Sequence, residues 1–263
     1  MRIIAGEFRS RRLLSPPDDS ITRPIPDRVK ESLFGLLRGH CEGAFVFDGF
    51  AGTGSIGLEA LSRGAARCVF VEQDKSIASL LSRNIDALNV RDRAELVVGD
   101  ALGPGALARA PRPLTLAFLD PPYPMIQEPV GFRRVMAQLS KLIDLLTDDG
   151  FAVLRTPWPL LHKQGSPAPL SPAPIKRRRG RPERRSRGDW QQELADPRAI
   201  PGRRAHDLSD LSEQDEEALE IAQQPAVAPK PVWVKVDLEL PNAQGPETHV
   251  YHNMAVHLYM RKA

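Results

Sequence analysis

The chain has 263 residues, a formal net charge of +3 at pH 7 and two cysteines. Isolated cysteines such as Cys41 and Cys68 argue against a disulfide framework, and no apolar run is long enough for a signal peptide or a membrane span. We therefore expect a cytoplasmic protein without disulfides. The small net charge averages opposed basic and acidic blocks, so local clusters are the better guide to a polyanionic partner.

The first 40 residues are basic, with eight Lys or Arg side chains and five acids. A short hairpin is predicted around Phe8, and a helix follows it. The arginines of the predicted hairpin are Arg9, Arg11 and Arg12. The residues on the apolar face of the predicted helix are Val29, Leu33, Leu36 and Leu37. Basic side chains beside an aromatic suit a phosphate backbone with a stacking base, and an ordinary solvated surface is the alternative.

Residues 44–47 form an apolar run that predicts a buried strand, and Asp48 follows it directly. The next residues fit the pattern G-x-G-x-x-G through Gly52, Gly54 and Gly57, ahead of a helical pattern. Glycines allow close backbone approach to a nucleotide, and the start of a helix offers free N–H groups. The segment predicts a nucleotide-like ligand, with a dinucleotide and S-adenosylmethionine both open at this point.

Two further predicted strands, 67–71 and 94–98, also end close to acids. Glu72 follows the first, twenty residues after Gly52, where a carboxylate would grip the ribose hydroxyls of either NAD or S-adenosylmethionine. Asp100 follows the second strand, where it would accept a hydrogen from an adenine amine. For each acid taken alone, the alternative is a solvated strand end.

A fourth apolar run, 114–119, leads into Asp120, Pro121, Pro122 and Tyr123. In a parallel sheet these residues emerge at the carboxyl edge, where open α/β sheets bind ligands. The exocyclic amine of a base is a poor nucleophile, so a site must accept its N–H hydrogens, and the Asp120 carboxylate and Pro121 carbonyl are candidates. Tyr123 offers a flat face to a base taken out of its helix. The pattern predicts methylation of an amino nitrogen, with a simple turn after a strand as the alternative.

Between about Pro157 and Pro231 the composition changes, because this segment holds twelve of the 25 prolines and has little apolar periodicity. We expect it to be largely disordered. Residues 176–187 carry eight basic side chains and one acid, which predicts a polyanion-binding arm or a solvated charge run. Within it, 179–182 is similar to an AT-hook, a motif of the DNA minor groove. The acidic run 207–220 either masks the basic run or is an independent solvated tail.

The chain after this insertion again predicts strands. Apolar and polar residues alternate in 232–240 and in 255–260, which is typical of two half-buried strands of an antiparallel hairpin. The insertion is therefore expected to interrupt a domain rather than end it. His249 and His252 have the spacing H-x-x-H, but in an extended segment they face opposite sides, so no metal site is predicted.

Together these segments resemble the bacterial 16S rRNA guanine-N2 methyltransferases, the family that acts on the guanine numbered 966. The resemblance is carried by 2–6, by Arg23-Pro24 with 27–34, and by 50–64, in addition to 120–123. It implies a class I S-adenosylmethionine-dependent methyltransferase fold, Rossmann-like α/β, with a mostly parallel seven-stranded sheet, a carboxyl-terminal antiparallel hairpin and a small basic amino-terminal hairpin and helix. The expected domains are an RNA-contact extension (1–40), a methyltransferase domain (41–160 with 231–263) and the insertion (161–230).

The resemblance also implies the members of each site. The residues expected to hold S-adenosylmethionine are Asp48, Phe50, Ala51, Gly52, Thr53, Gly54, Glu72, Gln73, Gly99, Asp100 and Ala101. The residues expected to hold the guanine amine are Asp120, Pro121, Pro122 and Tyr123. The residues expected to contact RNA are Arg9, Arg11, Arg12, Arg23 and Arg28. The implied partner is 16S rRNA in the small ribosomal subunit or an assembly intermediate, the implied state is a monomer, and neither a metal nor a membrane is expected.

Three positions depart from the family pattern. Ser10 stands where glycine is common in the amino-terminal hairpin, Gly49 where cysteine or leucine is frequent, and His252 where a tight turn usually has glycine. Two other functions stay open: an adenine-N6 DNA methyltransferase, since the same motif serves that chemistry, and a non-catalytic RNA-binding assembly protein with a methyltransferase fold. The acids at successive strand ends favour an enzyme over the second alternative.

Overall fold

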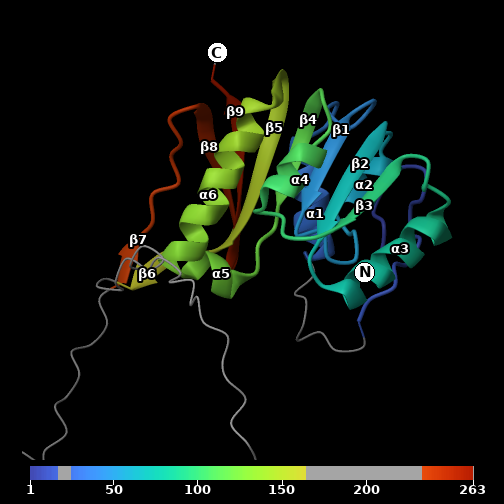
Figure 1. The fold of residues 1–263 in the computed structure, drawn as a ribbon, viewed down its shortest axis with the longest axis horizontal. Helices are drawn as coiled ribbons and strands as arrows, with labels where there is room; N and C mark the ends of the chain where they lie inside the picture. The colour runs from blue at the N-terminus through green and yellow to red at the C-terminus, as the bar shows by residue number, and fades with distance from the viewer. Residues whose placement is uncertain (17–24, 164–232, 263) are drawn as a thin grey trace, which may run out of the picture. The chain divides into compact units, whose positions relative to one another are not determined.

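A computed structural model of the chain describes residues 1–16, 25–163 and 233–262. These residues belong to one compact unit, Met1–Ala168 with Val232–Ala263. Strands from before and after the insertion join in one sheet, with helices packed against it (Figure 1). The predicted basic arm, the AT-hook-like sequence and the acidic run lie outside the described residues.

The central sheet has seven strands in the order β3-β2-β1-β4-β5-β9-β8. Its parallel strands are β1 (Phe45–Gly49), β2 (Arg67–Glu72), β3 (Ala94–Val98), β4 (Leu114–Leu119) and β5 (Leu146–Pro157). β9 (Met254–Arg261) runs antiparallel to β5, and β8 (Ala243–Tyr251) runs antiparallel to β9. A mostly parallel sheet that closes with an antiparallel hairpin confirms the predicted fold class.

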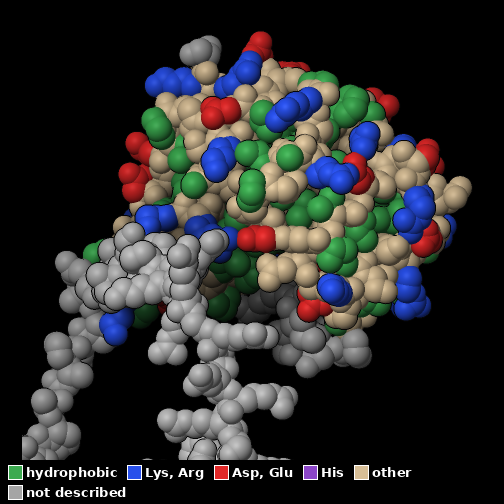
Figure 2. Space-filling view, in the orientation of Figure 1, with side chains coloured by type: hydrophobic (Ala, Val, Ile, Leu, Met, Phe, Trp, Pro, Cys, Tyr) green, Lys and Arg blue, Asp and Glu red, His purple; other side chains and the backbone are tan. Residues whose placement is uncertain are grey.

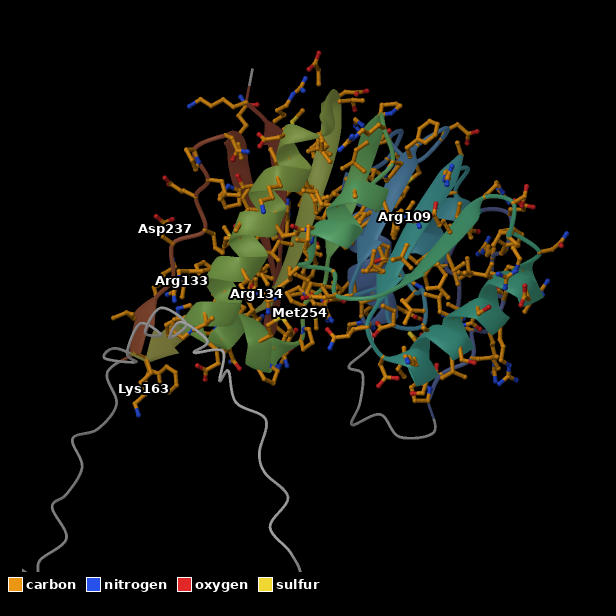
Figure 3. The ribbon with its side chains drawn as sticks, in the orientation of Figure 1. Arg109, Arg133, Arg134, Lys163, Asp237 and Met254 are labelled. Carbon is orange, nitrogen blue, oxygen red and sulfur yellow. The ribbon has the colours of Figure 1, made fainter. Side chains whose placement is uncertain are left out.

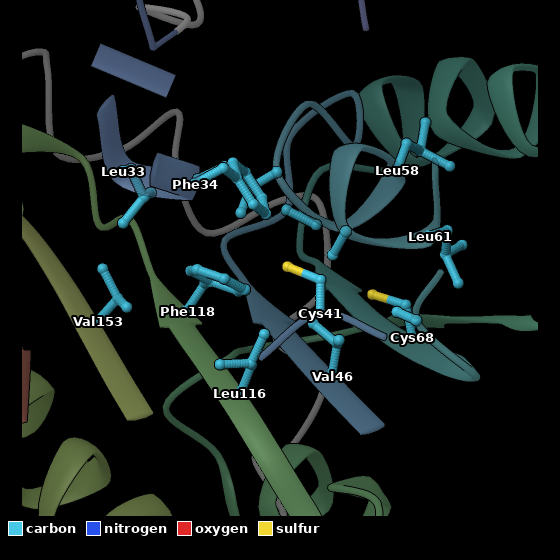
Figure 4. Close-up of a cluster of buried hydrophobic side chains, with 14 of the residues drawn as sticks. Leu33, Phe34, Cys41, Val46, Leu58, Leu61, Cys68, Leu116, Phe118 and Val153 are labelled. Carbon is cyan, nitrogen blue, oxygen red and sulfur yellow. The ribbon is translucent and has the colours of Figure 1, made fainter. Parts of the chain in front are cut away.

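Helices form a hydrophobic core on each face of the sheet. The helices are α1 (Asp27–Leu36), α2 (Gly57–Ser62), α3 (Lys75–Leu88), α4 (Pro104–Arg109), α5 (Tyr123–Gln127) and α6 (Pro129–Asp144). Successive strand residues face opposite sides, so Val46 packs in the core with α1, α2 and α3, while Phe47 packs in the core with α4, α5 and α6. In the first core, Leu33 and Phe34 of α1 approach Phe118 of β4 (Figure 4). The alternation explains why the strands are apolar throughout.

The apolar face of α1 differs in part from the prediction. Val29, Leu33 and Leu37 are buried as predicted, but Leu36 is 39% exposed, so its assignment to the buried face was wrong. Lys30 takes part in the buried face instead and is 1% exposed. A charged side chain is almost never fully buried without a partner. The orientation of α1 is therefore linked to an ion pair as well as to apolar packing.

The partner of Lys30 is Glu59 of α2, which is itself fully buried. Its carboxylate accepts hydrogen bonds from the backbone N–H of Ile4, at 2.7 Å, and of Ala5, at 3.0 Å. Lys30 Nζ lies 3.4 Å from one carboxylate oxygen, and Arg63 Nε lies 2.8 Å from the other. Burial lowers the pKa of Lys30, and the Glu59 charge opposes that change. One carboxylate thus joins the amino-terminal segment, α1 and α2.

The predicted strand 232–240 is mostly not a strand, and this prediction was wrong. Only β7 (Trp233–Lys235) is in a ladder, where it pairs with β6 (Leu161–Lys163) in a separate two-stranded sheet. The residues beyond it still place apolar side chains against the core. These side chains are Val236, Leu238 and Leu240. The alternation therefore predicted the inward side of these three residues correctly, but Val234 is 41% exposed and the strand pairing was wrong.

β8 takes the place of the predicted strand beside β9. Its sequence is mostly polar and contains Gly245-Pro246, at which the register with β9 shifts. Proline cannot donate to a ladder, and glycine inside a strand often marks a bulge, so the sequence gives little strand signal. β8 lies at the edge of the sheet, where such irregularity is tolerated.

Two non-glycine residues adopt left-handed backbone conformations where the family usually has glycine. Ser10 has φ of 69° and His252 has φ of 52°. His252 and Asn253 connect β8 to β9, so the tight turn is kept despite the histidine. An L-residue in this conformation costs about 1 kcal/mol relative to its usual conformations.

No helix within the described ranges is long and apolar enough to cross a bilayer. Within the same ranges, no three His, Cys, Asp or Glu side chains are grouped to hold a metal ion. Cys41 and Cys68 are buried free thiols, and burial raises the pKa of Cys41 to about 11.

Replacing His252 with glycine should stabilise the protein. His252→Gly removes the backbone strain of the turn, and we expect the free energy of unfolding to rise by about 0.5–1 kcal/mol. Urea denaturation measures the change, with His252→Ala as the control that deletes the exposed side chain but keeps the Cβ. Equal effects of the two substitutions would contradict the strain argument.

Replacing Glu59 should loosen the amino-terminal segment. Glu59→Gln leaves Lys30 as a buried charge without an anion, so the free energy of unfolding should fall by about 3 kcal/mol in urea denaturation. The control is Glu7→Gln, because Glu7 pairs with Arg93 and its side chain is 59% exposed, and its effect should stay below about 1 kcal/mol. A Glu59 effect as small as the control effect would refute the anchoring role.

Candidate active site

The carboxyl ends of β1, β2 and β4 open onto a cavity of about 1090 Å³. Gly49 of β1 is in register with Val71 of β2 on one side and with Leu119 of β4 on the other. The residues that follow these partners, Glu72 and Asp120, therefore lie on the two sides of β1. Parallel pairing thus brings acids that are far apart in the sequence together at one edge of the sheet.

Most of the residues predicted to hold ligands line this cavity. Those in its wall are Asp48, Phe50, Ala51, Gly52, Thr53, Glu72, Gln73, Gly99, Ala101, Asp120, Pro121, Pro122 and Tyr123. Gly54 and Asp100 are outside the wall. Residues that the sequence did not point to also line the cavity, and they include Met1, Ile25, Lys75, Met125 and Arg155. The amino-terminal segment and β5 therefore contribute to a site that was expected from the first four strands.

The three glycines of the loop have different structural roles. Gly52, with φ of +57°, lines the cavity, and a Cβ there would meet no atom within 4 Å, so a side chain would take ligand space. A Cβ on Gly54 would lie 2.4 Å from the Leu81 side chain, so Gly54 lets the loop pack on α3. A Cβ on Gly57 would lie 2.3 Å from Phe70 of β2. Only the first of the three is placed to touch a ligand.

Asp48 is 1% exposed at the base of the cavity. Its Oδ2 accepts the backbone N–H of Gly57, the first residue of α2, at 2.8 Å. Burial raises the pKa of Asp48 to about 7; the Gly57 hydrogen bond opposes this rise, and the nearby Asp120 and Glu72 charges add to it. The N–H group that a helix start would offer to an anionic ligand is thus already bound to a carboxylate.

Glu72 is fixed by the backbone on both sides. One carboxylate oxygen accepts the N–H of Gly52 at 2.9 Å, and the other accepts the N–H of Asp74 at 2.8 Å. Asp74 in turn caps α3 by accepting the N–H groups of Ser76 and Ile77. A carboxylate accepts about four hydrogen bonds, so Glu72 keeps capacity for two hydroxyls of a ligand.

Asp100 is bound to α6 and to its own turn. Its carboxylate pairs with Arg134 at 2.7 Å and accepts the N–H of Leu102 at 2.9 Å. Arg134 lies on α6, as Figure 3 shows. The neighbours of Asp100, Gly99 and Ala101, line the cavity instead. The turn after β3 is thus part of the site, but the Asp100 side chain does not line it.

Asp120 forms an ion pair with Arg155 of β5, with 2.5 Å between Oδ1 and Nε. Burial raises the pKa of Asp120, and the Arg155 charge opposes the rise. The Arg155 guanidinium also lies 5.6 Å from the centre of the Tyr123 ring. Pro122 accepts the N–H of Met125 at 2.9 Å, which starts α5 directly after the motif. Arg155 was missed because it lies 35 residues from Asp120 in an apolar strand.

Of the arginines predicted to contact RNA, those that the structure describes do not line this cavity. Arg9 lines a second cavity, of about 690 Å³, between the amino-terminal turn and the end of α1. Arg11 donates a hydrogen bond to the Ala87 carbonyl at 2.7 Å, and Arg12 and Arg28 are exposed. Arg23 lies outside the described residues.

The first part of the chain matches a known protein family. The model of the family described as Conserved hypothetical protein 95 matches residues 1–163. This range is more than half of the 263 residues and includes every described residue that lines the cavity. This chain belongs to that family. The family resemblance expected from the sequence is confirmed.

Curated relatives match more than half of the chain. The putative rRNA methyltransferase YlbH of Bacillus subtilis is 35% identical over 157 residues, which is 58% of this chain and 80% of the relative. Ribosomal RNA small subunit methyltransferase D of Escherichia coli K12 is 38% identical over 151 residues, which is 57% of this chain and 69% of the relative. Both names state that these relatives methylate ribosomal RNA.

Solved structures share the fold. A putative methyltransferase, yhhF, of Escherichia coli superposes with a TM-score of 0.57 at 22% identity and covers 100% of this chain and 98% of its own. The putative methylase HI0767 of Haemophilus influenzae has a TM-score of 0.53 at 21% identity, with the same coverage. At these identities the likeness shows the class I methyltransferase fold alone.

Replacing Asp48 should change how stability depends on pH. The pKa of Asp48 is about 7 in the folded protein against an ordinary 3.8, so its contribution is fully present below the lower value and is lost as pH rises through the higher one. From pH 4 to 7, the free energy of unfolding of the wild type should therefore fall relative to Asp48→Asn, by about 4 kcal/mol at most.

Urea denaturation between pH 4 and 8 tests this expectation. Asp86→Asn on the exposed surface of α3 is the matched control, because it also removes one carboxylate but should follow the wild type across this range. Parallel pH profiles for Asp48→Asn and the wild type would show that Asp48 is ionised as readily in the folded protein as in the unfolded chain.

Proposed function

We propose that this chain transfers a methyl group from S-adenosylmethionine to the exocyclic N2 amine of a guanine in 16S rRNA, of the position-966 class. Family membership and the names of the curated relatives support an activity on small-subunit rRNA. The observation that carries the proposal is the cavity itself, which unites Asp120, Pro121 and Tyr123 with the glycine loop and Glu72. The substrate would be the small subunit or an assembly intermediate, and the protein would act as a cytoplasmic monomer.

The charge of the cavity fits S-adenosylmethionine better than a dinucleotide. Among the residues that the structure describes, the charged ones in its wall are the acids Asp48, Glu72, Asp74 and Asp120 and the bases Lys75 and Arg155. Four acids against two bases make a negative wall, which suits a ligand with a sulfonium and an ammonium group. A pyrophosphate would instead face these acids, and the first N–H of α2 is already bound to Asp48.

Each group of the site has a proposed role in holding the ligands. Glu72 would accept the two ribose hydroxyls, and the turn at Gly99 and Ala101 would border the adenine. Gly52 would let the backbone approach the amino-acid part of the ligand. When bound, S-adenosylmethionine supplies an electrophilic methyl group on a positively charged sulfur.

The motif after β4 would orient the amine. Asp120 and the Pro121 carbonyl would accept its two N–H hydrogens, which turns the nitrogen lone pair toward the methyl group. The Pro122 carbonyl is bound to the start of α5, so Pro121 is the candidate for this role. Tyr123 would stack on the base. The carbon–nitrogen bond would form as the carbon–sulfur bond breaks, the sulfur would keep the electron pair, and the proton shed by nitrogen would leave to water.

Contacts with RNA outside the cavity would come from dispersed arginines. On the face shown in Figure 2, Lys and Arg side chains are interspersed with Asp and Glu rather than gathered in one patch. The proposed contacts are Arg9, Arg11, Arg12, Arg23 and Arg28. Such contacts to phosphates would position the RNA without reading its sequence.

The proposed reaction is tested by identifying the methylated nucleoside. The protein is incubated with labelled S-adenosylmethionine and, in separate reactions, small ribosomal subunits, naked 16S rRNA and duplex DNA, and the products are digested for mass spectrometry. N2-methylguanosine from the ribosomal RNA is expected. N6-methyladenine from DNA would replace the proposal with its nearest alternative, and no product from any substrate would favour a binding protein.

Replacing Asp120 should abolish methyl transfer but not ligand binding. Asp120→Asn removes one acceptor of the amine hydrogens, so the rate should fall at least about 100-fold, while S-adenosylmethionine affinity should stay within about threefold. Single-turnover rates and calorimetric titration measure the two quantities. Asp86→Asn is the surface control and should match the wild type in both. Near-normal turnover in Asp120→Asn would remove Asp120 from the mechanism.

A further inference from the structure

We propose that Arg155 is a positioning residue of this site, which fixes Asp120 as an ionised acceptor with one oxygen free for the amine and which holds the ring of Tyr123. The catalytic part of this inference rests on the proposed function. The ion pair and its effect on Asp120 can be tested without any methyl transfer. Neither the motif after β4 nor the glycine loop predicts an arginine at this place.

The geometry of the pair follows from the register of two parallel strands. Leu119 of β4 is in register with Leu154 of β5, so the residues that come next, Asp120 and Arg155, are neighbours at the carboxyl edge. Their side chains are 15% and 8% exposed, and both line the cavity. A pair this well shielded from water keeps much of its electrostatic strength. Strand pairing therefore places the Arg155 guanidinium beside the proposed catalytic carboxylate of Asp120.

The contact with Arg155 orients the Asp120 carboxylate and also favours its ionised form. Arg155 Nε is 2.5 Å from Oδ1 of Asp120, so a rigid planar group occupies that oxygen. Oδ2 then becomes the oxygen available to an amine hydrogen. A guanidinium does not lose its proton in proteins, so the positive member of the pair is kept at any working pH. Arg155 would therefore act through Asp120 rather than on the substrate.

The same guanidinium serves the aromatic residue of the motif. It lies 5.6 Å from the centre of the Tyr123 ring, within the range of a cation–π contact. Arg155 is itself supported by β9, since it is in register with Val256 and its Nη1 lies 3.9 Å from Met254 Sδ. β9, one of the strands after the insertion, thus supports Arg155, which positions Asp120 and Tyr123.

The charges around Asp120 explain why Arg155 is needed to keep Asp120 ionised. Burial raises the pKa of Asp120, and Arg155 is the cation that opposes the rise. Asp48 on β1 and Glu72 on β2 are acids of the same wall, and among the described residues Lys75 of α3 is its other base. On β9, burial lowers the pKa of His257 to about 4, so this residue is neutral near pH 7. Without Arg155, Asp120 would face mainly like charges in a desolvated place.

The direct test is the titration of Asp120 in the full chain without ligand. The carboxyl carbon of Asp120 is followed by NMR in protein labelled with carbon-13 aspartate, and Asp120→Asn assigns the signal. In Arg155→Gln the pKa of Asp120 should rise by about 1–3 units relative to the wild type. Arg91→Gln, which breaks the exposed pair with Asp86, is the control and should leave the Asp120 titration unchanged. An unchanged titration in folded Arg155→Gln would overturn the proposal.

A second readout is the pH profile of methylation. In Arg155→Gln the rate should fall about 10- to 100-fold at pH 7 and recover toward the wild-type rate as pH rises through the higher pKa of Asp120. A purely structural role would lower the rate by the same factor at every pH. If the wild type methylates nothing, the proposed function fails, while the NMR titration still decides the role of the ion pair.

Arg155→Lys separates charge from orientation and guards against a misfolded glutamine variant. Lysine keeps a positive charge but lacks the planar fork, so Asp120 should stay ionised at pH 7 while the rate falls at all pH values. Wild-type turnover in Arg155→Lys would refute the orienting role. A protonated Asp120 in the wild type at pH 7 would refute the electrostatic role.

Discussion

The buried carboxylate of Glu59 is the constraint on which the shape of the site depends. It binds two backbone N–H groups of the amino-terminal segment and the side chains of Lys30 and Arg63. Through these contacts a segment distant in sequence is held against α2, and residues as far apart as Met1 and Ile25 reach the cavity wall. The amino-terminal extension is thereby part of the cavity. The buried ion pairs of Glu59 with Lys30 and Arg63 stabilise the fold only while every partner is present.

The cavity itself concentrates negative charge where water is scarce. Asp48 is buried, Asp120 is largely so, and both have raised pKa values, so this arrangement is less stable than a neutral one would be. The structure limits this cost by hydrogen bonds from the backbone, as at Gly57, and by the cation of Arg155. A positively charged ligand would relieve the remaining repulsion. The same electrostatics that weaken the fold would therefore favour a sulfonium cofactor.

Short-range patterns predicted the first four parallel strands, because each is a mostly apolar run that is followed by a turn with an acid. β5 was not predicted, since its sequence begins with a polar stretch that includes Asp148 and Asp149. The positions of Glu72 and Asp120 at one edge follow from that pattern and from parallel pairing. Contacts made by distant segments were not predictable from local patterns. In the sequence, Lys30 cannot be told from a surface lysine, because its contact with Glu59 is formed only in the fold. Arg155 has no motif of its own, and β8 is too polar to be recognised as a strand.

The central claim is that this cavity holds S-adenosylmethionine with its methyl group beside Asp120. A crystal structure of the protein with S-adenosylhomocysteine, the product that cannot react, tests it directly. We expect the ribose hydroxyls on the Glu72 carboxylate, the adenine at the turn of Gly99 and Ala101, and the sulfur facing Asp120 and Tyr123. A ligand bound elsewhere, or one whose sulfur points away from Asp120, would contradict the account.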